Sequence, residues 1–292
     1  MAKSDTSTPA IIRRAFFVFA MLAASTRAAA PPNAPGPLAQ FGKPDAAEAE
    51  RILEQFRQSG VAGEYFWNFE LHQLPRRGDE RVFRGQLWGG RNAVGAVERI
   101  VLVDGDGRQR RLLLQHGGQA AVWQLDGKRA TALPADGLFA PLVPGVELTP
   151  FDLQMPFLNW PGATVESIVR MRGRPAYAFR FSPPAEFAAK HPQFGGVRSY
   201  FDTQYTVPVQ TERLSPTGAV LHTLSLIDVK KIGDQWMPRS FEVRNETSRD
   251  KTRLLVTGAA LNLTLPPATF DPAALAEAIP PPPVERIVVI PP

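Results

Sequence analysis

The sequence predicts an α+β protein built mainly from antiparallel β-strands, with short helices and a proline-broken segment covering one face of the sheet. Residues 197–265 read almost entirely as strands joined by short turns, such as the turn from Ser215 to Gly218. The strands before them are separated by Gly-Gly and Asp-Gly turns instead of helices, which favours a meander over βαβ units. A sheet with one apolar face must be covered, and the sequence offers only short covering elements.

The first 28 residues have the pattern of a secretory signal peptide. A basic segment precedes an apolar run at residues 15–24, and small residues around Ala28 provide a cleavage site. An uncleaved N-terminal anchor is the alternative interpretation. Residues 29–44 are proline-rich and are expected to form a flexible leader. No later run reaches the ~20 apolar residues of a membrane span, so we expect a periplasmic protein whose mature chain makes no stable membrane insertion.

Composition excludes several classes of site. The chain has no cysteine, so it forms no disulfide, thiolate metal site or cysteine nucleophile. The formal charge of +5 falls to +2 after cleavage at Ala28, with 29 basic and 27 acidic residues left. The basic residues are dispersed and are not interleaved with aromatic residues. We therefore expect no nucleic-acid partner.

A helix is expected to follow residue 45. Asp45 can cap its N-terminus and Glu48 stands three residues later, as in a capping box. Gly60 is a stop signal. Apolar residues at helical spacing form one face of this helix: Ala49, Ile52, Leu53 and Phe56.

The periodicity then changes to two. In GEYFWNFELHQL, Tyr65, Trp67 and Phe69 share one face with Leu71, and Phe66 is the exception on the other face. This alternation is typical of a half-buried strand. Further strands are expected around the segments RVFRGQLWG, VERIVLVD, RQRRLLLQH and AAVWQLD.

Residues 133–162, the cover segment, are apolar but contain too many prolines for a strand or a long helix. Thr149 can cap a short helix with Pro150 at its first position, and Pro156 ends it. A long apolar segment without regular structure usually lies over another part of the molecule. We expect the cover segment to lie across the open face of the sheet.

Strands resume after the cover segment. In RPAYAFRFS, Tyr177, Phe179 and Phe181 alternate with small or charged residues. Short helices are expected at 184–191 and 270–275. Residues 45–279 are interpreted as one domain, and the proline-rich tail 280–292 is interpreted as either an added edge strand or a disordered tail.

No catalytic or metal-binding constellation is visible. The four histidines lie far apart, and nucleophile-elbow, zinc-protease and phosphate-loop motifs are absent. Glu242, Arg244, Glu246 and Arg249 are interpreted as solvent-facing charges. We expect neither an enzyme nor a cofactor nor a bound metal.

Apolar surface is therefore the main candidate for function. A closed core of packed aromatic residues is one interpretation. A groove for an acyl chain is the other, because short, proline-broken covers open more easily than regular layers. The residues expected to line such a groove are Tyr65, Trp67, Phe69, Phe151, Leu153, Phe157, Leu158, Trp160, Tyr177, Phe179 and Phe181.

Across residues 45–276, the order of elements resembles the outer-membrane lipoprotein-sorting proteins, the LolA-like carriers, and in particular a longer, uncharacterised branch of that family. The resemblance lies in the order and spacing of short motifs at residues 151–153, 157–160, 198–202, 236–238, 251–253 and 270–272. It implies an unclosed antiparallel half-barrel, of roughly ten to twelve strands here, with helices in its concavity.

The resemblance also implies a function. Members bind the acyl chains of lipoproteins and pass them on, so the expected partner is a lipid or lipoprotein acyl chain held by a non-enzymatic monomer. Envelope-stress regulators with a similar domain dock a protein, so a lipid-sensing or protein-docking envelope module is the alternative.

Overall fold

The computed structural model describes residues 46–58, 60–205 and 207–291. The expected signal peptide and leader, together with the proposed cap Asp45, lie outside the described residues. Within them, fourteen strands form one antiparallel sheet. The strands are β1 (Glu64–Leu74), β2 (Arg81–Arg91), β3 (Ala96–Val103), β4 (Gln109–Gln115), β5 (Ala121–Asp126), β6 (Arg129–Ala132), β7 (Thr164–Met171), β8 (Arg174–Phe181), β9 (Gly196–Asp202), β10 (Pro208–Leu214), β11 (Val220–Ile232), β12 (Gln235–Asn245), β13 (Lys251–Leu263) and β14 (Val288–Val289).

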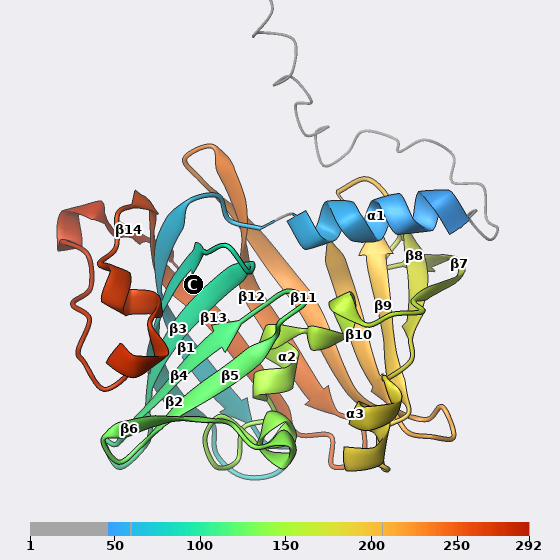
Figure 1. Cartoon of the computed structure of the whole chain (residues 1–292), viewed down its shortest axis with the longest axis horizontal. Helices are drawn as coiled ribbons and strands as arrows, with labels where there is room; N and C mark the ends of the chain where they lie inside the picture. Colours follow the sequence, from blue (N-terminus) through green and yellow to red (C-terminus); the bar gives the residue numbers. More distant parts are fainter. Residues whose placement is uncertain (1–45, 59, 206, 292) are drawn as a thin grey trace, which may run out of the picture. The chain divides into compact units, whose positions relative to one another are not determined.

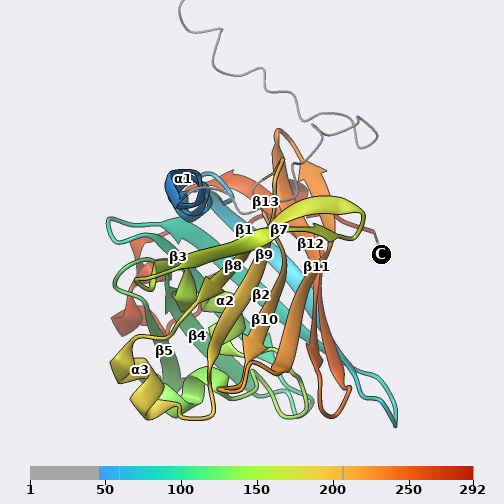
Figure 2. The same ribbon diagram turned by 90° about the vertical axis from the view of Figure 1, so that its right-hand side faces the viewer.

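The sheet is open. Its order is β6-β5-β4-β3-β2-β1-β13-β12-β11-β10-β9-β8-β7, with β14 added to β13. The end strands β6 and β7 do not pair with each other, so the sheet curves around its contents without closing (Figures 1 and 2). The predicted fold class, an unclosed half-barrel with short helices, is confirmed. The strand number exceeds the expected ten to twelve partly because β6 and β14 are too short to show a periodicity.

Short helices lie against the concave side. They are α1 (Ala46–Gln58), α2 (Pro150–Gln154) and α3 (Ala185–Lys190), with 3₁₀ turns at Ala135–Phe139 and Pro156–Asn159. The predicted face of α1 is confirmed, since Ala49, Ile52 and Leu53 are buried and the ring of Phe56 meets that of Phe201 at 5.1 Å. Figure 2 shows the sheet curving around α2.

The cover segment has the local structure that its sequence predicts. Thr149 caps α2 through a capping box with Asp152, and Pro150 occupies the first turn. The helix ends at Met155, which adopts a left-handed conformation with φ 48° and ψ 53° immediately before Pro156. A non-glycine residue in this region is uncommon, so the bend between α2 and the following 3₁₀ turn is a sharp and locally unfavourable one.

Two glycines make room for aromatic rings on the concave side of β2. Gly85 and Gly89 pair with Phe69 and Tyr65 of β1. A Cβ atom at Gly85 would lie 2.2 Å from the Phe69 ring, and one at Gly89 would lie 2.1 Å from the Tyr65 ring. The rings therefore lie flat across β2, which only glycine permits at these positions.

Residues 266–291 form the C-terminal strap, which packs on the convex side of the first strands. Its 3₁₀ turns are Pro267–Phe270, Pro272–Ala274 and Val284–Arg286, followed by β14. The helix expected at 270–275 is replaced by two of these turns. Ile279 and Ile287 pack with Phe66 and Trp88, and Leu275 packs with Val97 and Leu113.

A buried arginine anchors the strap. Arg99 of β3 is 0% exposed, and its guanidinium donates hydrogen bonds to the carbonyl oxygens of Ala268, Thr269, Ala274, Leu275 and Glu277. Burial lowers the pKa of Arg99 to about 10, so the side chain stays charged at neutral pH. Carbonyl dipoles at the ends of the 3₁₀ turns thus take the place of a carboxylate.

Candidate functional site

All eleven residues predicted to line a groove lie in, or pack against, two apolar clusters on the concave side. The wide cluster combines inward-facing side chains of β1–β5 and β11–β13 with the cover residues Leu142, Val143, Val146 and Leu148. The phenylalanine cluster combines α1, α2 and β7–β9 with cover residues. Tyr65, Trp67 and Phe69 belong to the wide cluster with Leu153 at its edge; Phe151, Phe157, Trp160, Phe179 and Phe181 belong to the phenylalanine cluster, with Leu158 and Tyr177 at its edge.

The phenylalanine cluster is a continuous set of ring contacts centred on Phe151 of α2. The Phe151 ring lies 4.7 Å from Phe139, 5.5 Å from Phe194 and 6.0 Å from Phe157, between ring centroids. Phe157 in turn meets Phe181 of β8 at 5.1 Å. Ring pairs at these distances add to the energy of simple burial. The short helix α2 is therefore held to the far wall of the half-barrel by aromatic packing.

The protein's own side chains fill the concavity. Phe151 and Phe157 are 1% exposed, and Phe179 and Phe181 are 0% exposed. The cover segment therefore lies directly on the apolar concave face of the sheet. Any ligand on this face must displace part of the cover segment.

The two clusters meet at a seam. Leu138 and Met155 are partly buried and pack against both clusters. Met155 is also the left-handed residue at which α2 ends. The seam between the clusters therefore coincides with the left-handed residue that ends α2.

Polar ties fasten the cover segment to its surroundings at separate points. Arg57 Nε of α1 donates to the Leu158 carbonyl at 2.8 Å, and Arg110 Nη1 of β4 donates to the Pro141 carbonyl at 2.7 Å. Gln154 Nε2 donates to two carbonyl oxygens, those of Gln115 and Ala121, each at 2.9 Å. The ties from Arg57 and Arg110 satisfy carbonyl oxygens that the irregular segment cannot pair by itself, and the tie from Gln154 satisfies carbonyl oxygens of β4 and β5.

A buried tyrosine–glutamate–histidine chain connects the sheet to α2. Tyr65 Oη donates to Glu98 Oε1 at 2.8 Å, His116 Nε2 lies 3.4 Å from Glu98 Oε2, and His116 Nδ1 donates to the Gln154 carbonyl at 3.1 Å. Burial and the neighbouring Glu98 raise the pKa of Tyr65 well above its ordinary value. Burial opposes ionisation of Glu98, but its contacts with His116 and Tyr65 outweigh that effect and lower its pKa.

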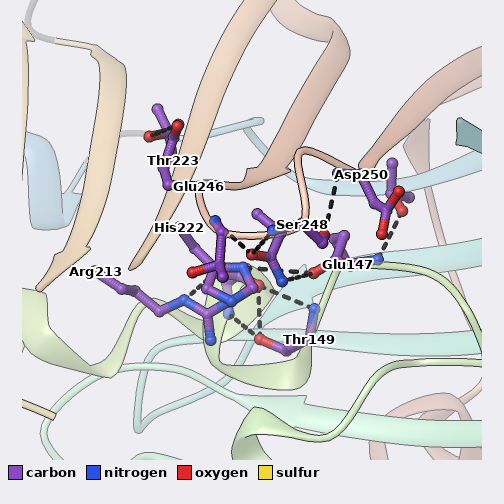
Figure 3. A network of polar contacts seen from close by, with 12 residues as sticks. Glu147, Thr149, Arg213, His222, Thr223, Glu246, Ser248 and Asp250 are labelled. Atoms are coloured by element: carbon purple, nitrogen blue, oxygen red, sulfur yellow. Dashed lines mark hydrogen bonds and ion pairs between the residues drawn. The ribbon is translucent and has the colours of Figure 1, made fainter. Parts of the chain in front are cut away.

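A second set of buried polar groups, the polar cluster, lies between the cover segment and the ends of β10–β13 (Figure 3). Its members are Glu147, Thr149, Asp152, Arg213, His222 and Asn245. Asn245 Nδ2 donates to Glu147 Oε2 at 3.1 Å, and Thr252 Oγ1 accepts from the Glu147 amide at 2.7 Å. Arg213 Nε lies 3.6 Å from Asp152 Oδ1, and His222 Nδ1 lies 3.7 Å from Glu147 Oε2.

The polar cluster is incompletely paired. Among the described residues, Arg213 Nη2 and His222 Nδ1 have no hydrogen-bond partner. Burial, together with the charge on Arg213, lowers the pKa of His222 to about 4, so the imidazole is neutral at pH 7. Burial also raises the pKa of Glu147. Unpaired buried groups of this kind are expensive, so this end of the cover segment is attached less firmly than the phenylalanine cluster.

The opposite, convex face of β10–β12 carries a polar hollow of about 590 Å³. It is lined by Gln210, Glu212, Val220, Thr223, Ser225, Glu242, Arg244, Glu246 and Arg249. Its three carboxylates are already paired: Glu212 with Arg198, Glu242 with Lys251 and Arg253, and Glu246 with Arg249. The four charges interpreted from the sequence as solvent-facing are all here. Within the described ranges, no three histidine, aspartate or glutamate side chains are placed to hold a metal ion.

Three features were missed by reasoning from the sequence. The polar cluster brings His222 together with residues far away in the sequence, and no local spacing predicts these contacts. The strap packs on the convex side of β1–β5 through Leu275, Ile279 and Ile287, whereas the sequence left its last residues as either an edge strand or a disordered tail. The exposure of Trp236, which is 57% exposed on β12, is not indicated by any local pattern. No helix in the described part of the chain is long and apolar enough to cross a membrane.

Comparison with known proteins confirms the fold. A family profile described as an uncharacterized protein matches residues 167–277, and no curated protein sequence matches the chain significantly. A crystal structure of an outer-membrane lipoprotein-sorting protein domain from Vibrio parahaemolyticus aligns with a TM-score of 0.67 at 14% identity, covering 79% of this chain and 97% of that one.

Two further crystal structures share the fold. A DUF1329 family protein from Desulfovibrio piger aligns with a TM-score of 0.65 at 12% identity, covering 78% of this chain and 98% of its own. A LolA superfamily protein from Nitrosomonas europaea aligns with a TM-score of 0.59 at 15% identity, covering 76% and 97%. The resemblance drawn from the sequence is therefore confirmed at the level of the fold.

Proposed function

We propose that this protein is a periplasmic, non-enzymatic carrier that binds an acyl chain of a lipid or lipoprotein on the concave face of the half-barrel. The observation that carries the proposal is that a segment of the chain itself fills that face. A short, proline-broken segment covers it in place of a second sheet, and all eleven predicted lining residues gather there. The shared fold with a lipoprotein-sorting domain supports the same function.

The energetics allow a ligand to replace part of the cover segment. Burying an acyl chain of about sixteen methylenes releases on the order of 10 kcal/mol at ~0.8 kcal/mol per methylene. Folding the cover segment outward exposes its own apolar side chains and breaks the ties at Arg57, Arg110 and Gln154. A fully buried Val, Leu or Phe side chain contributes about 1.5–3 kcal/mol, so a gain of this size offsets the outward movement of a few cover residues and not of the whole segment.

The test is binding of a fluorescent fatty acid, with native mass spectrometry of the purified protein. We expect co-purified lipid and a Kd in the micromolar range. Leu153→Asn and Leu158→Asn loosen partly buried cover residues without emptying the core, so they lower the cost of displacing the cover segment and should strengthen binding severalfold. Ile227→Asn, on an exposed apolar residue of β11, is the matched control and should bind normally. Absence of lipid and of fatty-acid binding would refute the carrier function.

One observation favours a second candidate, a lipid-sensing or protein-docking envelope module. Apolar side chains are exposed outside the concavity, notably those of Trp236 and Val289. Recovery of one stoichiometric protein from an envelope extract, with the concavity still filled, would support docking. Loss of that partner on Trp236→Ser would place the docking surface.

A further inference from the structure

The sheet has a gap between two neighbouring strands. β12 pairs with β13 only from Ser240 to Arg244, against Leu255 to Lys251. Before Ser240, β12 pairs with β11, whereas β13 continues past Leu255 along β1. The space between residues 235–239 and residues 256–263 is called the fork.

The end of the C-terminal strap fills the fork. Val288 and Val289 pair with Ala259 and Gly258, and the Ile290 amide donates to the Thr257 carbonyl at 2.9 Å. On the other side of the fork, Arg239 Nη2 donates to the Pro291 carbonyl at 2.6 Å. The last residues of the strap thus bridge two strands that do not pair with each other there.

Ile290 passes through the fork into the concave core. Its side chain is 3% exposed and belongs to the wide cluster, together with Met237, Val256 and Ala259. The strap otherwise packs on the convex side, against Phe66 and Trp88. Ile290 is therefore a short aliphatic side chain that reaches the concave apolar core from outside the sheet.

The segment around Ile290 is weakly held. Val284 is 83% exposed, Val289 77% and Val288 50%. β14 contributes two residues to the sheet, and the Arg99 anchor lies at the other end of the strap. Few buried contacts and a short ladder are the features of a segment that opens locally while the rest of the domain stays folded.

We propose that the fork is the port through which an acyl chain reaches the concave core, and that Ile290 occupies the site of the chain's first few methylenes. The inference rests on the proposed carrier function. An isoleucine side chain buries about as much apolar surface as four aliphatic carbons, so a longer alkyl chain outcompetes it. The backbone groups that β14 releases lie at the exposed mouth of the fork, where water replaces their partners.

The absence of cysteine allows a direct test. Ala259→Cys with Val288→Cys joins a cross-strand pair and locks β14 onto β13. Gln210→Cys with Ser225→Cys joins a pair on the convex face of β10 and β11 and is the matched control. We expect the oxidised lock to load fluorescent fatty acid at least tenfold more slowly, with full recovery on reduction, and the control to change less than twofold. Equal loading by the locked and reduced forms overturns the port.

A second measurement tests whether the fork opens in the absence of any ligand. Ile290→Cys places a thiol at the fork, and Leu102→Cys places one at an equally buried site of β3. Maleimide should label position 290 at least tenfold faster than position 102 in the native protein; equal rates overturn the port. If position 290 labels rapidly but no variant binds fatty acid, the carrier function fails while the opening of the fork stands.

Discussion

The two halves of the sheet are covered differently. In β1–β6, the cover segment packs on the concave side and the strap packs on the convex side, so Phe66 and Trp67 are both buried although they point in opposite directions. In β7–β12, only the concave side is covered. Phe201 of β9 is fully buried, whereas its neighbour Tyr200 faces the polar convex surface and donates to Glu212.

Because of this difference, the strands of the two halves should differ in how freely they bend. A strand that is packed on both sides can bend little without exposing apolar surface. A strand that is solvated on one side can twist more freely. We therefore expect β1–β6 to act as a fixed wall and the second half to accommodate movement of the cover segment.

The largest expected effect comes from alanine substitutions at neighbouring positions of one strand. Phe66→Ala and Trp67→Ala should each destabilise the protein by about 3–5 kcal/mol, because both side chains are buried. Phe201→Ala should have a similar effect, but Tyr200→Ala should lower stability by about 1 kcal/mol or less. Urea unfolding followed by fluorescence gives these values. Similar values for Tyr200→Ala and Phe201→Ala would remove the contrast between the halves.

Removing the anchor of the strap should make the first half resemble the second. Arg99→Ala removes the donor that five carbonyl oxygens share, although Arg111 still donates to those of Leu275 and Glu277, and it should lower the free energy of unfolding by about 3 kcal/mol. The strap should then be cleaved by protease much earlier than the rest of the domain. Arg108→Ala, at a side chain 80% exposed, is the control and should change little. A strap equally protected in both variants contradicts the anchoring role.

The polar cluster should give the second half a pH dependence. His222 has a pKa of about 4 in the folded protein against an ordinary 6.5, so the unfolded chain takes up the proton first as pH falls. Its contribution is intact above about pH 7 and is lost progressively toward pH 4, by about 2 kcal/mol at pH 5.

His222→Gln isolates this effect. The raised pKa of Glu147 acts in the opposite direction and persists in the variant. The difference between the two stability profiles between pH 7 and pH 5 therefore reports His222 alone. Parallel profiles would show that the imidazole is solvated and that this end of the cover segment is looser than the burial of His222 indicates.

The smallest effect concerns the packing of rings over glycine. Gly85→Ala places a methyl group against the Phe69 ring and should destabilise the first half by about 1–2 kcal/mol through overpacking. Gly105→Ala has open space around it and is the matched control. If both variants unfold at the same urea concentration, the Phe69 ring can move aside at little cost, and β1–β6 are less rigid than the burial of Phe69 indicates.

Local patterns in the sequence predict much of this architecture. The two-residue alternation from Tyr65 to Phe69 identifies β1 and its buried face, and Thr149 with Pro150 identifies α2. The gathering of aromatic residues under the cover segment also follows, because an apolar segment that cannot pair its backbone must lie on an apolar face.

Contacts between distant segments could not be predicted in this way. Nothing near Arg99 indicates that carbonyl groups of residues 268–277 surround it. Asp152 and Arg213 belong to segments with different local patterns, and their encounter depends on how the sheet curves. The fork forms because β12 and β13 diverge after five paired residues. Such divergence depends on the twist of the sheet and is not visible in the amino-acid composition of either strand.

The pairing of β1 with β13 constrains how the protein folds. Glu64 pairs with Leu263, so the middle of the sheet joins segments about two hundred residues apart. β1 is synthesised early, but it can pair with β13 only after nearly the whole polypeptide has been made. Until then, the apolar faces of β1 and β2 are open to aggregation, and a chaperone that holds the nascent chain would protect them.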